Sequence, residues 1–338
     1  MSVFEISIIK GKTVHDIVDA NIPRCVEIVT QAYLAHGEGQ TVNPASHFLR
    51  FPGKPNSRII ALPAFLGPKS GVAGLKWIAS FPDNIQQGFP RASAVLILND
   101  YATGYPFAIL ESSIISAART AASAVLGAQW LNLRSRDTHT LGIVGTGLIA
   151  RYVYRFLLAS GWRAEHLRLY DSAPGEAQRF LDATIRRDAH ASVAIAPDLP
   201  SLIRESSLVL LATTAGTPHI LDPQLFAHAP IVLHLSLRDL APEILLASDN
   251  IVDDVDHVMK ADTSPHLLEQ RVGHRDFITG TIADLMTGRC TIDRRKPAIY
   301  SPFGLGILDL AVGKWVFDEA VAAGLDLRLP DFFYDLTR

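Results

Sequence analysis

The sequence has few cysteines and no long hydrophobic run. Cys25 and Cys290 are the only two cysteines in 338 residues. Two distant thiols form neither a disulfide framework nor a cysteine-based zinc site, and they suit a reducing compartment, so a cytoplasmic location is expected. At the start of the chain, Glu5 and Lys10 interrupt the apolar residues that a secretory signal needs. No apolar run approaches the ~20 residues of a membrane span, so no membrane association is expected.

The chain also lacks a charge bias and a metal-binding motif. Its 31 Lys and Arg residues and 34 Asp and Glu residues give a net charge of −3, and the basic residues are scattered. This pattern gives no electrostatic reason to expect a nucleic-acid partner. The twelve histidines form no HExxH-like pattern, so no metal is expected. The hydrophobic content of 48% indicates a globular protein, and the length allows two domains.

One short segment, LGIVGTGLIA at 141–150, predicts a nucleotide-binding turn. Its strand-like beginning is followed by a helix-like segment, RYVYRFLLASG. Gly145 allows a sharp turn, Gly147 lets a pyrophosphate approach the backbone, and the small Ala150 lets helix and strand pack closely. A loop of small residues is often only a turn, so the flanking segments have to decide between these interpretations.

The segment HLRLYD supplies the second signal, because it reads as a short strand that ends at Asp171. A carboxylate at this place accepts hydrogen bonds from a ribose 2′-hydroxyl and repels a 2′-phosphate, and no arginine follows in SAPG. The sequence therefore favours NAD over NADP. The alternative role of Asp171 is that of a helix cap or turn residue.

The expected pattern of secondary structure changes near residue 116. The part before it contains a helix-like segment, three β-like runs, and a hairpin that turns at DYATGYP, which indicates antiparallel α+β structure. The part after it begins with a helix, ISAARTAASAVLGAQWL, and then alternates short apolar strands with helix-like segments. This alternation predicts a parallel doubly wound sheet.

The last segment, SPFGLGILDLAVGKWVFDEAVAAG, predicts a glycine-containing turn and a long helix that packs back on the first domain. The predicted fold class is therefore α/β: a Rossmann-like doubly wound parallel sheet plus a discontinuous α+β domain. Residues 1–117 with 301–338 are assigned to substrate binding and dimerisation, and residues 118–300 to NAD binding. The first domain has too few helices to cover both faces of its sheet, so a homodimer is expected.

Three charged residues are candidates for chemistry. Lys76 lies in the apolar run GLKWIASFPDN, where a buried ammonium needs an anionic partner; alternatively it lies on an exposed strand face. Arg119, in SAARTAASA, can grip a carboxylate or phosphate, or form an interdomain salt bridge. Asp239, in VLHLSLRDLAPE, follows the fifth apolar strand, where ligands bind in such sheets; it can act as a base, or cap a turn beside Arg238. Thr213 and Thr214 end the preceding strand and either contact the cofactor or form a turn.

Four ordered segments resemble the ornithine cyclodeaminase/mu-crystallin family across nearly the whole chain: GLKWIASFPDN, ISAARTAASA, GTGLIA and SPFGLGILDLAVGKWVFDEA. The resemblance implies catalytic roles for Asp239 and Lys76, a small amino-acid substrate and a homodimer. It implies substrate contacts at Arg50, Lys76, Asn84 and Arg119. It implies cofactor contacts at Arg119, Gly145, Thr146, Gly147, Leu148, Ile149, Asp171, Thr213 and Ser236.

Two departures from the cyclodeaminase pattern bear on the substrate. SLRDLAPE replaces G-A-D-x-P-G-K, so Glu243 stands where a lysine is usual, and Ala45 and Ser46 stand near the place of a family arginine, with Arg50 further on. These segments resemble the branch that makes 2,3-diaminopropionate for siderophores of the staphyloferrin B type. In that branch NAD oxidises N-(1-amino-1-carboxy-2-ethyl)glutamate, and water splits the imine into 2-oxoglutarate and 2,3-diaminopropionate. A cyclodeaminase, an amino-acid or imine dehydrogenase, and a non-catalytic mu-crystallin-like binding protein remain alternatives.

Overall fold

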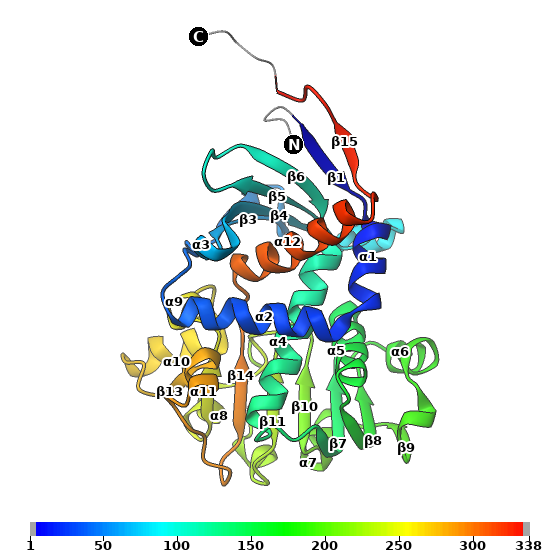
Figure 1. Cartoon of the computed structure of the whole chain (residues 1–338). Coiled ribbons are helices and arrows are strands. Elements are labelled where there is room, and N and C mark those ends of the chain that lie inside the picture. Colours follow the sequence, from blue (N-terminus) through cyan, green and yellow to red (C-terminus); the bar gives the residue numbers. More distant parts are fainter. Residues whose placement is uncertain (1–4, 334–338) are drawn as a thin grey trace. The chain divides into compact units, whose positions relative to one another are not determined.

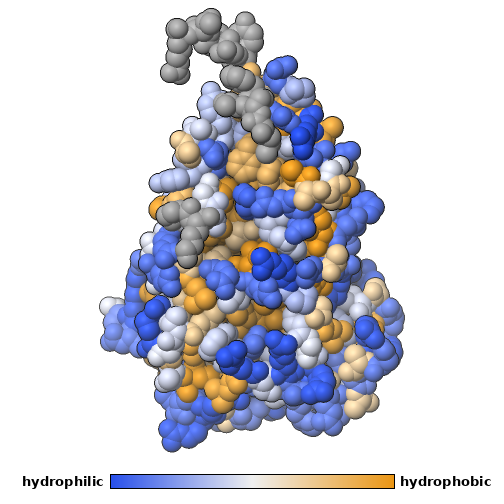
Figure 2. All heavy atoms as spheres, viewed as in Figure 1, coloured by the Kyte–Doolittle hydropathy of each residue, from blue (hydrophilic) through white to orange (hydrophobic). Residues whose placement is uncertain are grey.

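The computed structural model describes residues 5–333 and divides into two compact units. Unit 1 comprises residues 1–119 and 305–338, and unit 2 comprises Thr120–Gly304. Helix α4 (Ser113–Leu131) runs across the boundary between them. No helix among the described residues is long and apolar enough to cross a membrane. Hydrophilic residues are interspersed with smaller hydrophobic areas on the face shown in Figure 2.

Unit 1 is built on a seven-stranded sheet with the order β15-β1-β6-β5-β4-β3-β2. The expected hairpin is confirmed, because β5 and β6 pair antiparallel. The sheet is mostly antiparallel, as expected, and one pair, β1 with β6, is parallel. The strands are β1 (Ile6–Ile9), β2 (His47–Phe51), β3 (Lys54–Phe65), β4 (Val72–Ser80), β5 (Ala92–Asp100), β6 (Pro106–Glu111) and β15 (Leu327–Leu329). The helices are α1 (Gly11–Ala20), α2 (Ile22–Gly37), α3 (Gly67–Ser70), the 3₁₀ helix η1 (Pro82–Gln87) and α12 (Gly306–Ala322).

Helix α12 packs on α2 and on one face of this sheet (Figure 1). Two glycines make the close approach possible. A Cβ on Gly313 would lie 2.1 Å from Leu96, and one on Gly74 would lie 2.7 Å from Leu310. The C-terminal helix therefore completes the core of unit 1, and the prediction of a discontinuous α+β unit is confirmed.

Unit 2 is an eight-stranded sheet with the order β13-β12-β14-β11-β10-β7-β8-β9, in which all pairs are parallel. The predicted doubly wound sheet is confirmed. The strands are β7 (Asp137–Val144), β8 (Arg163–Tyr170), β9 (Ser192–Ile195), β10 (Leu208–Leu211), β11 (Ile231–His234), β12 (Asp249–Val252), β13 (Ile278–Thr281) and β14 (Ala298–Ser301). The helices are α5 (Leu148–Ala159), α6 (Glu176–Thr184), η2 (Arg187–Ala189), α7 (Leu199–Glu205), η3 (Pro223–Phe226), α8 (Pro242–Leu246), α9 (Val255–Val258), α10 (Ser264–Val272) and α11 (Ile282–Thr287).

The strand order places a switch point between β7 and β10. From β7 the chain adds β8 and β9 on one side and then returns to add β10 on the other. In open parallel sheets, ligands bind outside the carboxyl ends of the strands at such a point. The loops after β7 and β10 in unit 2 are therefore where a ligand is expected.

Candidate functional site

The loop after β7 has the form that a nucleotide phosphate needs. Gly145 has a φ of +83°, and a Cβ there would lie 2.7 Å from the carbonyl oxygen of Ala212, so only glycine fits between the two loops. No atom lies within 4 Å of a Cβ built on Gly147, so the chain itself leaves the space beside it open. Gly147 begins α5 without a side-chain cap, which leaves the first N–H groups of the helix available to an anion.

The carboxylate of Asp171 accepts hydrogen bonds that hold this loop in place, and it can accept a further one. One of its oxygens accepts hydrogen bonds from the backbone N–H and the hydroxyl of Thr146, at 2.8 and 2.7 Å. The other accepts the N–H of Ala173 at 2.9 Å, so the expected turn role is present as well. A carboxylate offers about four acceptor sites, so these three bonds leave room for a ribose hydroxyl. The residues present therefore fit a dinucleotide. Next to this loop, Leu148 is exposed and Ile149 is half-buried.

Asp239 lies among groups from the carboxyl ends of β10 and β11. Its side chain is fully buried. Its Oδ1 accepts hydrogen bonds from the Thr213 hydroxyl and from Nε2 of His219, which lies 3.0 Å away. Nearby, the Ser236 hydroxyl donates to the carbonyl of Leu211 at 3.1 Å. The Arg238 guanidinium donates to the carbonyl of Ala261.

His234 is the buried neighbour on the other side of Asp239. Its Nδ1 lies 3.2 Å from the Ser301 hydroxyl at the end of β14. Its Nε2 accepts the backbone N–H of Asp239 at 3.2 Å and lies 3.3 Å from Oδ2 of the same residue. Because that nitrogen already accepts a proton, Oδ2 has no donor among the described residues. One oxygen of Asp239 is thus fixed, and the other is buried without a hydrogen-bond partner among the described residues.

The pKa of Asp239 follows from these surroundings. Burial raises it, but the neighbouring side chains of His234, Ser236 and Thr213 lower it by more, so the pKa lies well below its usual range. The carboxylate is therefore ionised at any physiological pH.

In unit 1, Lys76 and Arg119 meet at Asp309, a residue that the sequence analysis missed. The Lys76 ammonium lies 2.7 Å from one oxygen of Asp309 and donates to the Ser116 hydroxyl at 3.2 Å. Nε of Arg119 donates to the other oxygen at 3.3 Å. Lys76 and Asp309 are buried, so the exposed-lysine interpretation is wrong. Burial lowers the pKa of Lys76 to about 8, although the Asp309 charge opposes this.

Two predicted substrate contacts lie in other places within unit 1. Arg50 on β2 pairs in register with Arg58 on β3, and its guanidinium stacks over the Phe48 ring. Lys76 on β4 pairs with Leu62, four residues further along β3, so Arg50 and Lys76 are not aligned across the sheet. Asn84 donates to the carbonyl of Pro90 at 3.3 Å, which closes the loop around η1. Their roles in substrate binding stay predictions.

Glu243, the residue at the cyclodeaminase lysine position, has a partner of its own. It is exposed in the first turn of α8 and pairs with Arg271. The Arg271 hydrogen bond lowers the pKa of its carboxyl. Glu243 is thus held on the surface as a solvated ion pair.

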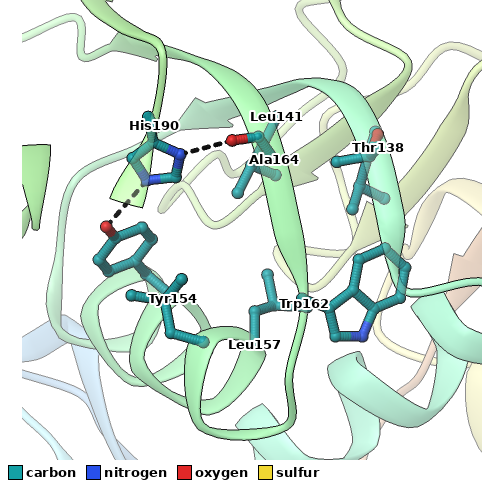
Figure 3. A pocket seen from close by; sticks show the side chains of 9 residues that line it. Thr138, Leu141, Tyr154, Leu157, Trp162, Ala164 and His190 are labelled. Carbon is teal, nitrogen blue, oxygen red and sulfur yellow. Dashed lines mark hydrogen bonds between the residues drawn. The ribbon is translucent and has the colours of Figure 1, made fainter. Parts of the chain in front are cut away.

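A small hollow in unit 2 is separate from all these residues (Figure 3). Its lining is mostly apolar and includes Leu157 and Trp162. The Tyr154 hydroxyl lies 3.0 Å from Nε2 of His190, whose Nδ1 donates to the carbonyl of Ala164 at 2.8 Å. No carboxylate or ammonium lines it, so it offers a charged nucleotide or amino acid no partner.

A model of the ornithine cyclodeaminase/mu-crystallin family matches residues 12–324. The chain belongs to this family. It is 27% identical over 305 residues to N-((2S)-2-amino-2-carboxyethyl)-L-glutamate dehydrogenase of Staphylococcus aureus, covering 87% of this chain and 89% of that one.

Two solved structures share the fold. Thermococcus litoralis Δ1-pyrroline-2-carboxylate reductase, in complex with NADH and L-proline, has a TM-score of 0.86 at 21% identity, covering 95% of this chain and 99% of that one. An archaeal alanine dehydrogenase dimer with bound NAD has a TM-score of 0.85 at 22% identity, covering 97% and 100%.

Proposed function

We propose that the chain oxidises N-(1-amino-1-carboxy-2-ethyl)glutamate with NAD and hydrolyses the resulting imine to 2-oxoglutarate and 2,3-diaminopropionate. At the coarser level, it is an NAD-dependent oxidoreductase that acts on the CH–NH group of an amino-acid substrate, as its relatives do. The observation that carries the proposal is the buried carboxylate of Asp239, which has one open oxygen and follows the carboxyl end of a parallel strand. The SLRDLAPE segment and the staphylococcal relative support the particular substrate.

NAD fits the residues around the loop after β7. The N–H groups at the start of α5 would hold its pyrophosphate, Asp171 its ribose, and Thr213 and Ser236 would lie near the rest of it. When bound, it supplies a hydride acceptor. Leu148, Ile149 and Arg119 remain predicted cofactor contacts.

The chain's own residues would handle protons and charge. The open Oδ2 of Asp239 accepts the proton of the substrate amine, which keeps the nitrogen neutral while the hydride leaves the adjacent carbon. After this proton has passed to solvent, the same oxygen accepts a proton from the water that attacks the imine carbon and returns it to the nitrogen of 2,3-diaminopropionate as the C–N bond breaks. His219 bonds to Oδ1 and its side chain is 40% exposed, so it offers a route for the proton to solvent. The Lys76 ammonium and Arg119 hold substrate carboxylates.

Mass spectrometry of the products tests this proposal. Incubating the glutamate conjugate with NAD should yield 2-oxoglutarate, 2,3-diaminopropionate and NADH in equal amounts. Ammonia and proline formed from ornithine would instead indicate a cyclodeaminase. Nucleotide binding without any turnover of the conjugate, ornithine, alanine or Δ1-pyrroline-2-carboxylate would indicate a binding protein.

We also propose a homodimer formed through the sheet of unit 1. On one face of β5, Leu96 and Leu98 are fully buried. On the opposite face, Val95 is 41% exposed and pairs in register with Trp77 on β4. Burying such a face against a second copy removes apolar surface from water. Light scattering should give a dimer mass for the native chain and a monomer mass for Val95→Lys. The control Leu246→Lys, at an exposed leucine of unit 2, should stay dimeric; a native monomer would refute the proposal.

A further inference from the structure

Two imidazoles and a carboxylate gather on β7 and β8 of unit 2, apart from every residue used above. His139 Nδ1 lies 2.9 Å from one oxygen of Glu165, and His166 Nε2 lies 3.6 Å from the other. One ligand atom from each of the three residues falls within 4.8 Å of the other two. The two imidazole rings pack edge to face with their centroids 4.8 Å apart.

These separations suit a single metal ion. Zinc binds imidazole nitrogen and carboxylate oxygen at about 2.0–2.2 Å, so two ligands of one tetrahedral ion lie about 3.3 Å apart. The observed 2.9 and 3.6 Å contacts are of this order and reach different oxygens of Glu165, so the side chains must rotate to share one ion. The paired backbones of β7 and β8 hold all three residues near one another.

A further contact supports His166 as a ligand. Its Nδ1 lies 2.9 Å from the Ser192 hydroxyl on β9. When Nδ1 donates to this hydroxyl, Nε2 carries the lone pair and faces Glu165. A hydrogen bond from the second ring nitrogen is the usual support of a metal-bound histidine.

We propose that His139, Glu165 and His166 bind one divalent transition-metal ion of the zinc type, with water completing the coordination. His139 precedes the buried residues 140–144 of β7, and His166 on β8 pairs in register with the first of them, whereas the nucleotide loop follows the last. The metal therefore acts on the stability of unit 2 and takes no part in hydride transfer. It ties β7 to β8 directly and to β9 through Ser192. A motif search along the sequence misses this site because its ligands come from two separate strands.

Calorimetric titration of the full chain with zinc tests the site. The native chain should bind one zinc ion, and zinc should raise its melting temperature. Glu165→Gln and His139→Ala should each lose both effects. The matched control is His274→Ala, because His274 and Asp276 form another exposed imidazole–carboxylate pair, 3.4 Å apart; this variant should bind zinc like the native chain.

Each other outcome overturns the proposal. Equal zinc uptake by the native chain, Glu165→Gln and His139→Ala would mean an adventitious ion only. Absence of uptake by the native chain would mean that the cluster is a simple ion pair. Melting curves recorded without metal check that each variant is folded before titration. Folding of the variants is expected, because the side chains of His139 and Glu165 are exposed.

Discussion

Asp309 in unit 1 and Asp239 in unit 2 are both fully buried, yet their partners differ in kind. Asp309 faces two cations, Lys76 and Arg119, one on each oxygen. Asp239 faces a hydroxyl and two imidazoles, and one of its oxygens lacks a donor. Two cations balance the charge of a buried carboxylate, whereas imidazoles can exchange protons with it. We therefore predict that Asp309 fixes charged groups in place and that Asp239 moves protons.

The largest expected effect is on turnover. Asp239→Asn keeps the shape of the side chain and removes its basicity, so kcat should fall by roughly 10²–10⁴ while NAD binding is retained. Steady-state kinetics and a nucleotide titration measure the two quantities. Asp276→Asn, whose side chain is 90% exposed, is the control and should behave like the native chain. Near-native turnover in Asp239→Asn would place the base elsewhere.

The matching change at Asp309 should act on stability. Asp309→Asn leaves the buried Lys76 ammonium and the partly buried Arg119 guanidinium without a counter-charge, so the free energy of unfolding should fall by about 3–5 kcal/mol, as denaturant titration would show. Asp318→Asn, on the same helix and paired with Lys314 at the surface, should lose less than about 1 kcal/mol. Equal losses in the two variants would contradict the assigned role of Asp309.

A smaller effect should appear in the dependence of kcat/KM on pH. The proposed role of Lys76 in holding a substrate carboxylate requires its protonated form, and its pKa is lowered from 10.5 to about 8. Therefore kcat/KM should fall as pH rises through about 8, by up to tenfold per pH unit, whereas an ordinary lysine would keep its charge to higher pH. Lys314→Ala should leave this descending limb unchanged. A flat profile between pH 8 and 10 would show that the Lys76 charge is not needed.

The smallest effect concerns cofactor choice. NAD should be used much better than NADP, and Asp171→Ala should narrow the ratio of their kcat/KM values, because the carboxylate that repels a 2′-phosphate is gone. The surface variant Asp188→Ala, which removes a partner of Arg186, should keep the native ratio. Equal use of both cofactors by the native enzyme would contradict the role of Asp171.

The features predicted from the sequence were those encoded locally. The Gly145 turn, the strand that ends at Asp171 and the position of Asp239 after a strand each depend on a few neighbouring residues. Asp309 was missed although it is the only acid in the apolar stretch GILDLAVG, because its partners come from β4 and α4. His219 and His234 were missed because only loop closure and the register of parallel strands bring them to Asp239. The functional division into a substrate domain and an NAD domain stays a prediction.

Isotope tracing follows both the hydride and the oxygen atom of the proposed reaction. The conjugate would carry deuterium on the α-carbon of its glutamate half and be incubated with NAD in ¹⁸O-labelled water. The account predicts deuterium in the reduced nicotinamide and one solvent-derived oxygen in 2-oxoglutarate, with 2,3-diaminopropionate unlabelled in both respects. Deuterium that stays in the amino-acid product, or reduced nicotinamide without 2-oxoglutarate, would contradict it.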